Sequence, residues 1–211
     1  MGTKCSAHYA NIFMGDFEEK WIYKLIGKHS NFYTRFIDDI FLLWTGTLDE
    51  LKDFIKKLNN VHPTIKFEEK YSFDSINFLD THIYKNKEGK LCSTLYVKPT
   101  DRQSYLHQKS YHPTAAKKSI AYSQALRIKR ICTENSEFTK HANNLIQKLK
   151  LRGYKKEMSE EIIKKVNTID RTTLLEPKPK ITNGVSPIIV TYHRNLPNIK
   201  SALDKNWYIY I

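Results

Sequence analysis

Two adjacent carboxylates, Asp38 and Asp39, are the side chains in this sequence with the clearest capacity for chemistry. They lie within a run of apolar, aromatic and β-branched residues at 33–44. Such residues favour β-strands, so the run predicts two short strands joined by a tight hairpin turn at the Asp pair. Two like charges at one turn repel each other unless a cation neutralises them. Carboxylate oxygens suit Mg²⁺ or Mn²⁺, and pairs of such ions catalyse phosphoryl or nucleotidyl transfer.

The pair also has a purely structural interpretation, because Asp is common in turns. For an isolated Asp-Asp pair that interpretation is the better one, since short motifs often occur by chance. The surrounding elements must therefore decide between a metal site and an ordinary turn.

The elements around the pair predict a mixed helix and strand region. Apolar residues recur at three- and four-residue spacing over 10–25 and again over 48–58, which predicts an amphipathic helix on each side of the hairpin. Residues 65–71 alternate as a strand does. Strands over 76–84 and 91–98 flank a Gly-containing turn and predict a second hairpin.

Three helices are predicted to follow, over 114–132, 136–151 and 159–168. The first begins after Pro113, which suits a helix start. Basic and apolar residues alternate along this first helix, which predicts one buried and one cationic face. Its basic residues are Lys117, Lys118, Arg127, Lys129 and Arg130.

Charge is distributed unevenly along the 211 residues, whose formal net charge is +13. Residues 1–84 hold 10 Lys and Arg against 12 Asp and Glu, whereas residues 85–180 hold 22 against 9. A basic segment of this kind suits contact with a phosphate backbone. A solvated, lysine-rich surface explains the charge equally well, and charge alone leaves both interpretations open.

The cysteines and the hydropathy exclude several classes of protein. Three cysteines lie far apart and form no disulfide framework, which favours a reducing compartment. No apolar run approaches membrane-spanning length, so we expect an intracellular protein of the nucleus or cytoplasm, with no membrane partner. His107 and His112 could bind zinc with Cys92 or Cys132, but their spacing matches no standard ligand set.

Five short runs carry a more specific signal. They are Phe-Ile-Asp-Asp at 36–39, preceded by Tyr-Ala-Asn-Ile-Phe-Met at 9–14 and followed by Phe-Leu-Asp-Thr at 78–81, Lys-Pro-Thr-Asp at 98–101 and Ser-Tyr-His-Pro at 110–113. In this order they resemble Penelope-like retroelement reverse transcriptases. The resemblance implies an α+β fold followed by an all-α part: the second half of a palm over 1–98, a helix-turn-helix-like thumb over 99–175, and a linker with the start of a connector over 176–211.

The resemblance also implies an activity, which is RNA-directed DNA synthesis by two-metal nucleotidyl transfer. An RNA template, a DNA primer and deoxynucleoside triphosphates would be the partners, with no obligate protein partner evident. Asp38 and Asp39 would bind Mg²⁺ or Mn²⁺, and Gly2, Tyr9 and Asn11 would lie near the template or the nucleotide. The cations expected to contact the duplex are Lys98, Lys117, Lys118, Arg127, Lys129 and Arg130.

The resemblance is to only part of that family's enzyme. In that family the remaining metal-binding Asp lies on a strand before the helix that positions template and nucleotide, which the predicted helix over 10–25 resembles. The present sequence begins at that helix, without the fingers. We therefore expect a fragment that is inactive as a polymerase alone. The alternative is a non-enzymatic, helix-turn-helix-like module that binds nucleic acid and remains from a decayed element. Asp80 is expected to be a structural turn residue.

Overall fold

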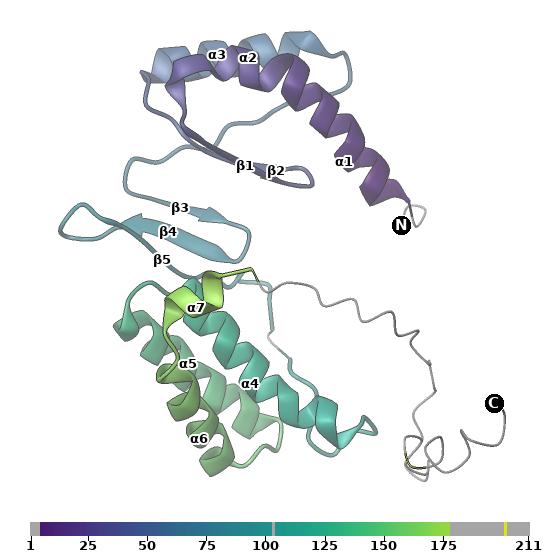
Figure 1. Ribbon diagram of the computed structural model, residues 1–211, viewed down its shortest axis with the longest axis vertical. Coiled ribbons are helices and arrows are strands. Elements are labelled where there is room, and N and C mark those ends of the chain that lie inside the picture. The colour runs from purple at the N-terminus through teal and green to yellow at the C-terminus, as the bar shows by residue number, and fades with distance from the viewer. Residues whose placement is uncertain (1–4, 103, 178–200, 202–211) are drawn as a thin grey trace, which may run out of the picture. The chain divides into compact units, whose positions relative to one another are not determined.

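The computed structural model describes residues 5–102, 104–177 and 201. The chain forms two compact units, Met1–Lys85 and Asn86–Ile211 (Figure 1). Among the described residues, the first unit combines helices with two short hairpins, and the second consists of helices and one strand. The expected α+β character is therefore confirmed.

The N-terminal helical run is longer than the spacing predicts. It consists of α1 (Ser6–Phe17), a π-helical segment η1 (Glu18–Ile22) and α2 (Tyr23–Ile26), followed by a short 3₁₀ turn η2 (Gly27–His29). Gly27 has a φ of 51°, a conformation that favours glycine and that ends the α-helix. The π segment widens the helix at Glu18, and such segments are frequent at functional sites.

The predicted first hairpin is present, with its turn one residue earlier than the Asp pair suggests. Strands β1 (Phe32–Phe36) and β2 (Asp39–Leu43) are antiparallel, with Phe36 opposite Asp39. The turn residues are therefore Ile37 and Asp38. Ile37 has a φ of 56°, which is rare for a β-branched residue.

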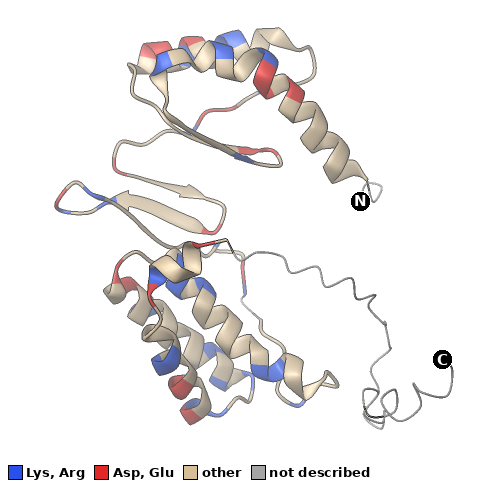
Figure 2. Ribbon diagram, viewed as in Figure 1, with Lys and Arg blue, Asp and Glu red and all other residues tan. Residues whose placement is uncertain are grey.

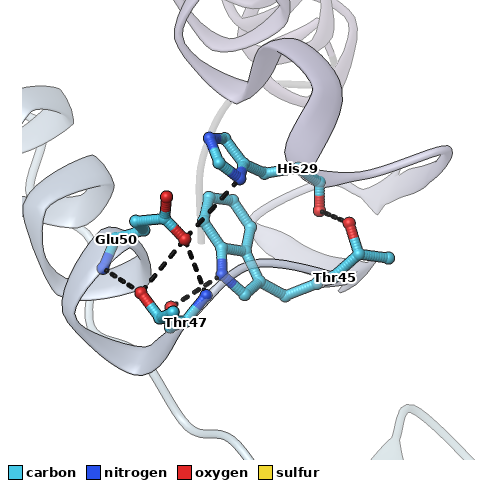
Figure 3. Close-up of polar contacts among 5 residues, drawn as sticks. His29, Thr45, Thr47 and Glu50 are labelled. Atoms are coloured by element: carbon cyan, nitrogen blue, oxygen red, sulfur yellow. Dashed lines mark hydrogen bonds and ion pairs between the residues drawn. The ribbon is translucent and has the colours of Figure 1, made fainter.

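Helix α3 (Leu48–Val61) begins with a complete capping box, shown in Figure 3. Thr47 Oγ1 accepts a hydrogen bond from Glu50 N, and Glu50 Oε2 accepts one from Thr47 N at 2.7 Å. The His29 ring stacks on Trp44 at 5.0 Å between centroids, beside this cap. Together these contacts join the end of β2 to the start of α3.

The strand expected over 65–71 is wrong. This segment has no regular secondary structure and pairs with no strand among the described residues. The Asn59 side chain takes the place of a strand partner, because its Nδ2 donates to Phe67 O and its Oδ1 accepts from Phe67 N. The apolar residues Ile65 and Phe67 pack against the core, which accounts for the alternating pattern.

The expectation of a single strand over 76–84 is also wrong. The structure has two strands there, β3 (Ser75–Phe78) and β4 (Thr81–Lys85). They are antiparallel, with Phe78 opposite Thr81. Leu79 and Asp80 form the turn, and Leu79 has a φ of 54°.

The core of the first unit lies between its helices and the inner face of the first hairpin. Tyr33, Ile40 and Leu42 of the hairpin pack against it. The fully buried members are Phe17, Ile22, Ile26, Leu51, Phe54 and Leu58.

Within residues 86–102 and 104–177, the second unit contains β5 (Leu91–Leu95) and four helices: α4 (Thr114–Ile131), α5 (Asn135–Leu151), α6 (Lys156–Asn167) and α7 (Arg171–Leu175). The three predicted helices are confirmed, α6 beginning three residues early, whereas the short α7 has no counterpart among them. Ala125 and Val166 are completely buried where these helices meet, and Phe138 fills the space between them. Two hydrogen bonds join strand β5 to the end of α4 and the α4–α5 connection. Ser93 Oγ donates to Ile131 O, and Thr133 N donates to Ser93 O.

Two further expectations concern membranes and the C-terminal tail. Within 5–102 and 104–177, every helix is too short or too polar to cross a bilayer. The expected connector beyond residue 177 lies outside the described residues, apart from residue 201.

Candidate functional site

Asp38 and Asp39 lie at the exposed end of the β1–β2 hairpin. Asp38 is the second turn residue, and Asp39 is the first residue of β2. Their positions at a two-residue turn hold both carboxylates close to the same end of the sheet. Both side chains are thus accessible from solvent, as binding of a hard cation requires.

Arg35 fixes the backbone of this turn from the inner face of the hairpin. Its Nη1 donates to the carbonyl of Ile37 at 2.8 Å and to Asn11 Oδ1 of α1 at 3.0 Å. The guanidinium therefore links the turn to α1 while it supports the unusual conformation of Ile37.

Glu18 neutralises Arg35 through a two-point contact. Arg35 Nε donates to Glu18 Oε1 at 2.6 Å, and Nη2 donates to Glu18 Oε2 at 3.3 Å. Only 11% of the Arg35 side chain and 10% of the Glu18 side chain are exposed. The hydrogen bonds to Glu18 raise the pKa of Arg35, although burial opposes them. The guanidinium therefore keeps its charge, and removing one partner of so little exposed an ion pair is costly.

Tyr33 completes this buried group by donating its phenol proton to Glu18 Oε1 at 2.8 Å. Burial, and then the bond to Glu18, raises the pKa of Tyr33 far above its ordinary value. The phenol therefore stays protonated and remains a hydrogen-bond donor. Glu18 lies in the π segment, which places its carboxylate where both donors reach it.

The residues predicted to lie near the template or the nucleotide do not form one group in the structure. Asn11 belongs to the Arg35 group, whereas Tyr9 lies on α1 with 74% of its surface exposed. Gly2 lies outside the described residues.

The described residues contain no group of three or more Asp, Glu, His or Cys side chains that could hold a metal ion. Asp38 and Asp39 are thus two ligands, which is fewer than a two-metal site needs. Three of the four residues considered for zinc have other contacts: His107 Nδ1 accepts from Lys109 N, Cys92 Sγ donates to Glu134, and Cys132 Sγ contacts Thr94 Oγ1.

In the second unit, α5 and α6 are joined by a four-residue turn, Arg152 to Lys155, as in a helix-turn-helix. Gly153 has a φ of 81° in this turn, and Arg152 N donates to Leu149 O. Tyr154 is buried and donates its phenol proton to Leu106 O. Helix α4 packs against both α5 and α6, which completes a three-helix arrangement.

The predicted cations of α4 differ in their exposure and in their contacts. Lys118 and Arg127 are exposed, whereas Lys117 is half-buried and donates to Ser110 O. Lys129 donates to Asn167 Oδ1 of α6 at 3.1 Å and lies over the Phe138 ring. Arg130 Nε donates to Leu174 O of α7 at 3.0 Å. Lys98 is exposed in the segment that follows β5.

Several polar residues important for these sites leave little signal in the sequence. Glu18 and Arg35 are separated by 17 residues, and only the fold brings them together. Arg171, on the unpredicted α7, donates from Nε to Arg130 O at 3.0 Å. The sequence offers one sign of the Glu18–Arg35 contact, which is that Arg35 is a single charged residue within an apolar strand.

Comparison with known proteins gives a match in the second unit. Neither a curated protein nor a solved structure matches the chain. The animal helix-turn-helix domain matches residues 104–164, which contain α4, α5 and most of α6. The helical part of the second unit is therefore similar to an animal helix-turn-helix domain.

Proposed function

We propose that the second unit is a nucleic-acid-binding module that holds a duplex mainly through its phosphates. The observation that carries the proposal is the match of residues 104–164 to the animal helix-turn-helix domain. The α5–turn–α6 geometry, with Gly153 in the turn, supports it.

The charge of α4 supports phosphate contact. This helix contains Lys117, Lys118, Arg127, Lys129 and Arg130 and no acidic residue. Lysine and arginine on a helix surface neutralise phosphates and release counterions, so the affinity of such a site falls steeply with salt. Phosphate contacts position a protein without reading sequence. Lys98 would add a further contact from the segment after β5.

Duplex binding by the purified full chain tests this proposal. We expect fluorescence anisotropy with a labelled duplex to show binding that weakens as salt rises. The Arg127→Gln/Arg130→Gln variant should bind less tightly and lower the salt slope by about one for each of the two arginines that contacts a phosphate. Lys56→Gln/Lys57→Gln is the matched control, because it also removes two positive charges and both lysines are exposed on α3 of the first unit. Salt-independent binding, or equal weakening in both variants, would contradict the proposal.

A second proposal concerns the first unit, which we propose to be the second half of a reverse-transcriptase palm. Its support is the β1–β2 hairpin, which presents Asp38 and Asp39 at its exposed end, where Arg35 fixes the backbone. In this proposal the palm covers residues 1–98, the thumb 99–175 and the connector the remainder. Tyr9, Asn11 and Gly2 would lie near the template or nucleotide.

The partners in this second proposal are an RNA template, a DNA primer and deoxynucleoside triphosphates. Asp38 and Asp39 would contribute two of the carboxylates for Mg²⁺ or Mn²⁺, which would supply Lewis-acid activation in the intact enzyme. Since the described residues offer no further ligand beside them, we expect no primer extension by this chain alone. In this proposal the two carboxylates belong to the palm of a retrotransposon polymerase.

Two measurements test the second proposal. Paramagnetic broadening by Mn²⁺ should be greatest at the amides of residues 37–39 and should disappear in the Asp38→Asn/Asp39→Asn variant. Broadening spread evenly over exposed carboxylates would oppose a palm hairpin. A primer-extension assay with Mg²⁺ tests the expected inactivity, and templated extension that Asp38→Ala abolishes would refute it.

A further inference from the structure

Helix α6 occupies the place of the recognition helix, but its charges are arranged against that role. In a helix-turn-helix, residues near the N-terminus of the second helix contact the bases in the major groove. The corresponding half of α6 carries Glu157, Glu160 and Glu161. Its one lysine there, Lys156, is paired with Glu160 at 3.3 Å. Carboxylates brought between two phosphate backbones are repelled by both.

The opposite end of α6 is basic and adjoins other cations. Lys164 and Lys165 lie in its last turns, and Lys165 Nζ lies 5.9 Å from the centre of the Tyr122 ring of α4. The last residue of α6, Asn167, accepts the hydrogen bond from Lys129 of α4. Figure 2 shows blue ribbon where α4 meets α7 and red ribbon at the far end of α6.

Helix α7 adds arginine to this end and orients it. Arg171 Nε donates to Arg130 O, and Arg130 Nε donates to Leu174 O. Each arginine therefore uses Nε on a backbone carbonyl of the other helix. That bond fixes the plane of the guanidinium and lowers the entropy cost of a two-point contact with a phosphate.

An acidic residue beside this cluster is already engaged. Asp170 accepts hydrogen bonds from Thr172 N and Thr172 Oγ1, which cap α7 and lower the pKa of Asp170. Its charge offsets part of the cluster, and Lys129 lies close enough to contribute to that lowered pKa. The four cations outnumber Asp170 at this end of the helices.

We infer that the duplex is held by the surface formed by Lys129, Arg130, Lys165 and Arg171, at the C-terminal ends of α4 and α6 and on α7. We name this the α4–α6–α7 surface. It binds the phosphate backbone, and the N-terminal half of α6 does not enter the major groove. Binding is therefore indifferent to base sequence. The inference rests on the proposed nucleic-acid-binding function and deepens it.

Two lysines at opposite ends of α6 provide a matched test in the full chain. Lys165→Gln and Lys156→Gln each remove one positive charge from an exposed position of the same helix, so neither should disturb the fold. We expect Lys165→Gln to weaken duplex binding severalfold and to lower the salt slope by about one. Lys156→Gln should leave affinity unchanged, and two duplexes of unrelated sequence should bind alike.

Each other outcome has a definite meaning. Greater weakening with Lys156→Gln, or equal weakening with both, would overturn the inference and favour α6 as a groove-reading helix. Unchanged affinity in both variants, while the unaltered chain binds, would also overturn it and place the duplex elsewhere. Absence of binding by the unaltered chain would instead refute the proposed function. Arg171→Gln, checked by thermal unfolding, should weaken binding as Lys165→Gln does.

Discussion

Removing the charge of Arg35 is predicted to destabilise the first unit strongly. In Arg35→Met, the Glu18 carboxylate stays buried and keeps the Tyr33 phenol as a donor, without the two guanidinium bonds. Leaving one member of a buried ion pair without its partner costs about 3–5 kcal/mol. Removal of the bond to Ile37 O adds about 1 kcal/mol. We therefore expect Arg35→Met to lower the free energy of unfolding by about 4–6 kcal/mol.

The double variant Glu18→Leu/Arg35→Met tests whether the cost comes from the unpaired charge. Replacing both members of a buried ion pair by apolar residues is often nearly neutral. The double variant should therefore be more stable than Arg35→Met alone, although it still lacks the bond to Ile37 O. If the two substitutions instead add, the buried charge is not the cause of the destabilisation.

Urea unfolding followed by tryptophan fluorescence reports on this unit selectively. Of the three tryptophans, Trp21 and Trp44 lie in the first unit, so the measurement is made in a Trp207→Phe background. Lys20→Met is the control, because Lys20 and Asp16 form an ion pair with each side chain 60% exposed. The control should cost less than about 1 kcal/mol. A cost for Arg35→Met no larger than that of the control would refute the reasoning.

Three further predictions concern stability. Thr47→Ala removes the acceptor for Glu50 N and should lower the free energy of unfolding by about 1 kcal/mol, whereas Thr47→Ser should retain most of the stabilisation by the cap. Equal losses in the two variants would show that the cap is not the cause. Phe138→Ala should lower the free energy of unfolding of the second unit by about 3–5 kcal/mol, because only 2% of its surface is exposed; circular dichroism in urea measures this, and a decrease under about 1 kcal/mol contradicts it. Burial lowers the pKa of His141, so the unfolded chain binds its proton more readily and stability should fall as pH drops below about 6.5. His141→Gln should flatten this pH dependence of the thermal midpoint, and an unchanged slope would exclude His141 as its source.

The sequence predicted helices and the first hairpin well, because these depend on local spacing. The capping box of α3 and the Gly-containing α5–α6 turn have strong local signals, and the structure contains both. The prediction of a strand over 65–71 failed, because the alternation of apolar and polar residues there arises from burial of Ile65 and Phe67 and not from pairing with another strand. The strand over 76–84 failed because the turn at Leu79 has no glycine or proline to mark it.

The sites were predictable to different degrees. Asp38 and Asp39 are conspicuous in the sequence, and the structure shows which of them begins β2. The contact of Glu18 with Arg35 depends on the π segment and on the packing of the hairpin, neither of which leaves a periodic pattern. Arg171 escapes prediction because α7 has only five residues, too few for a hydrophobic period.

Arg35 also favours the observed register of β1. Both faces of β1 and β2 are apolar: Tyr33, Ile40 and Leu42 face the core, whereas Phe32 and Phe41 lie on the other side. A slip of one residue exchanges the two faces, and burial of apolar surface alone would hardly oppose it. The slip would, however, move Arg35 away from Glu18 and leave a buried carboxylate unpaired. The contact of Arg35 with Glu18 thus opposes a slip of β1, and it favours the pairing in which Asp39 closes the ladder opposite Phe36.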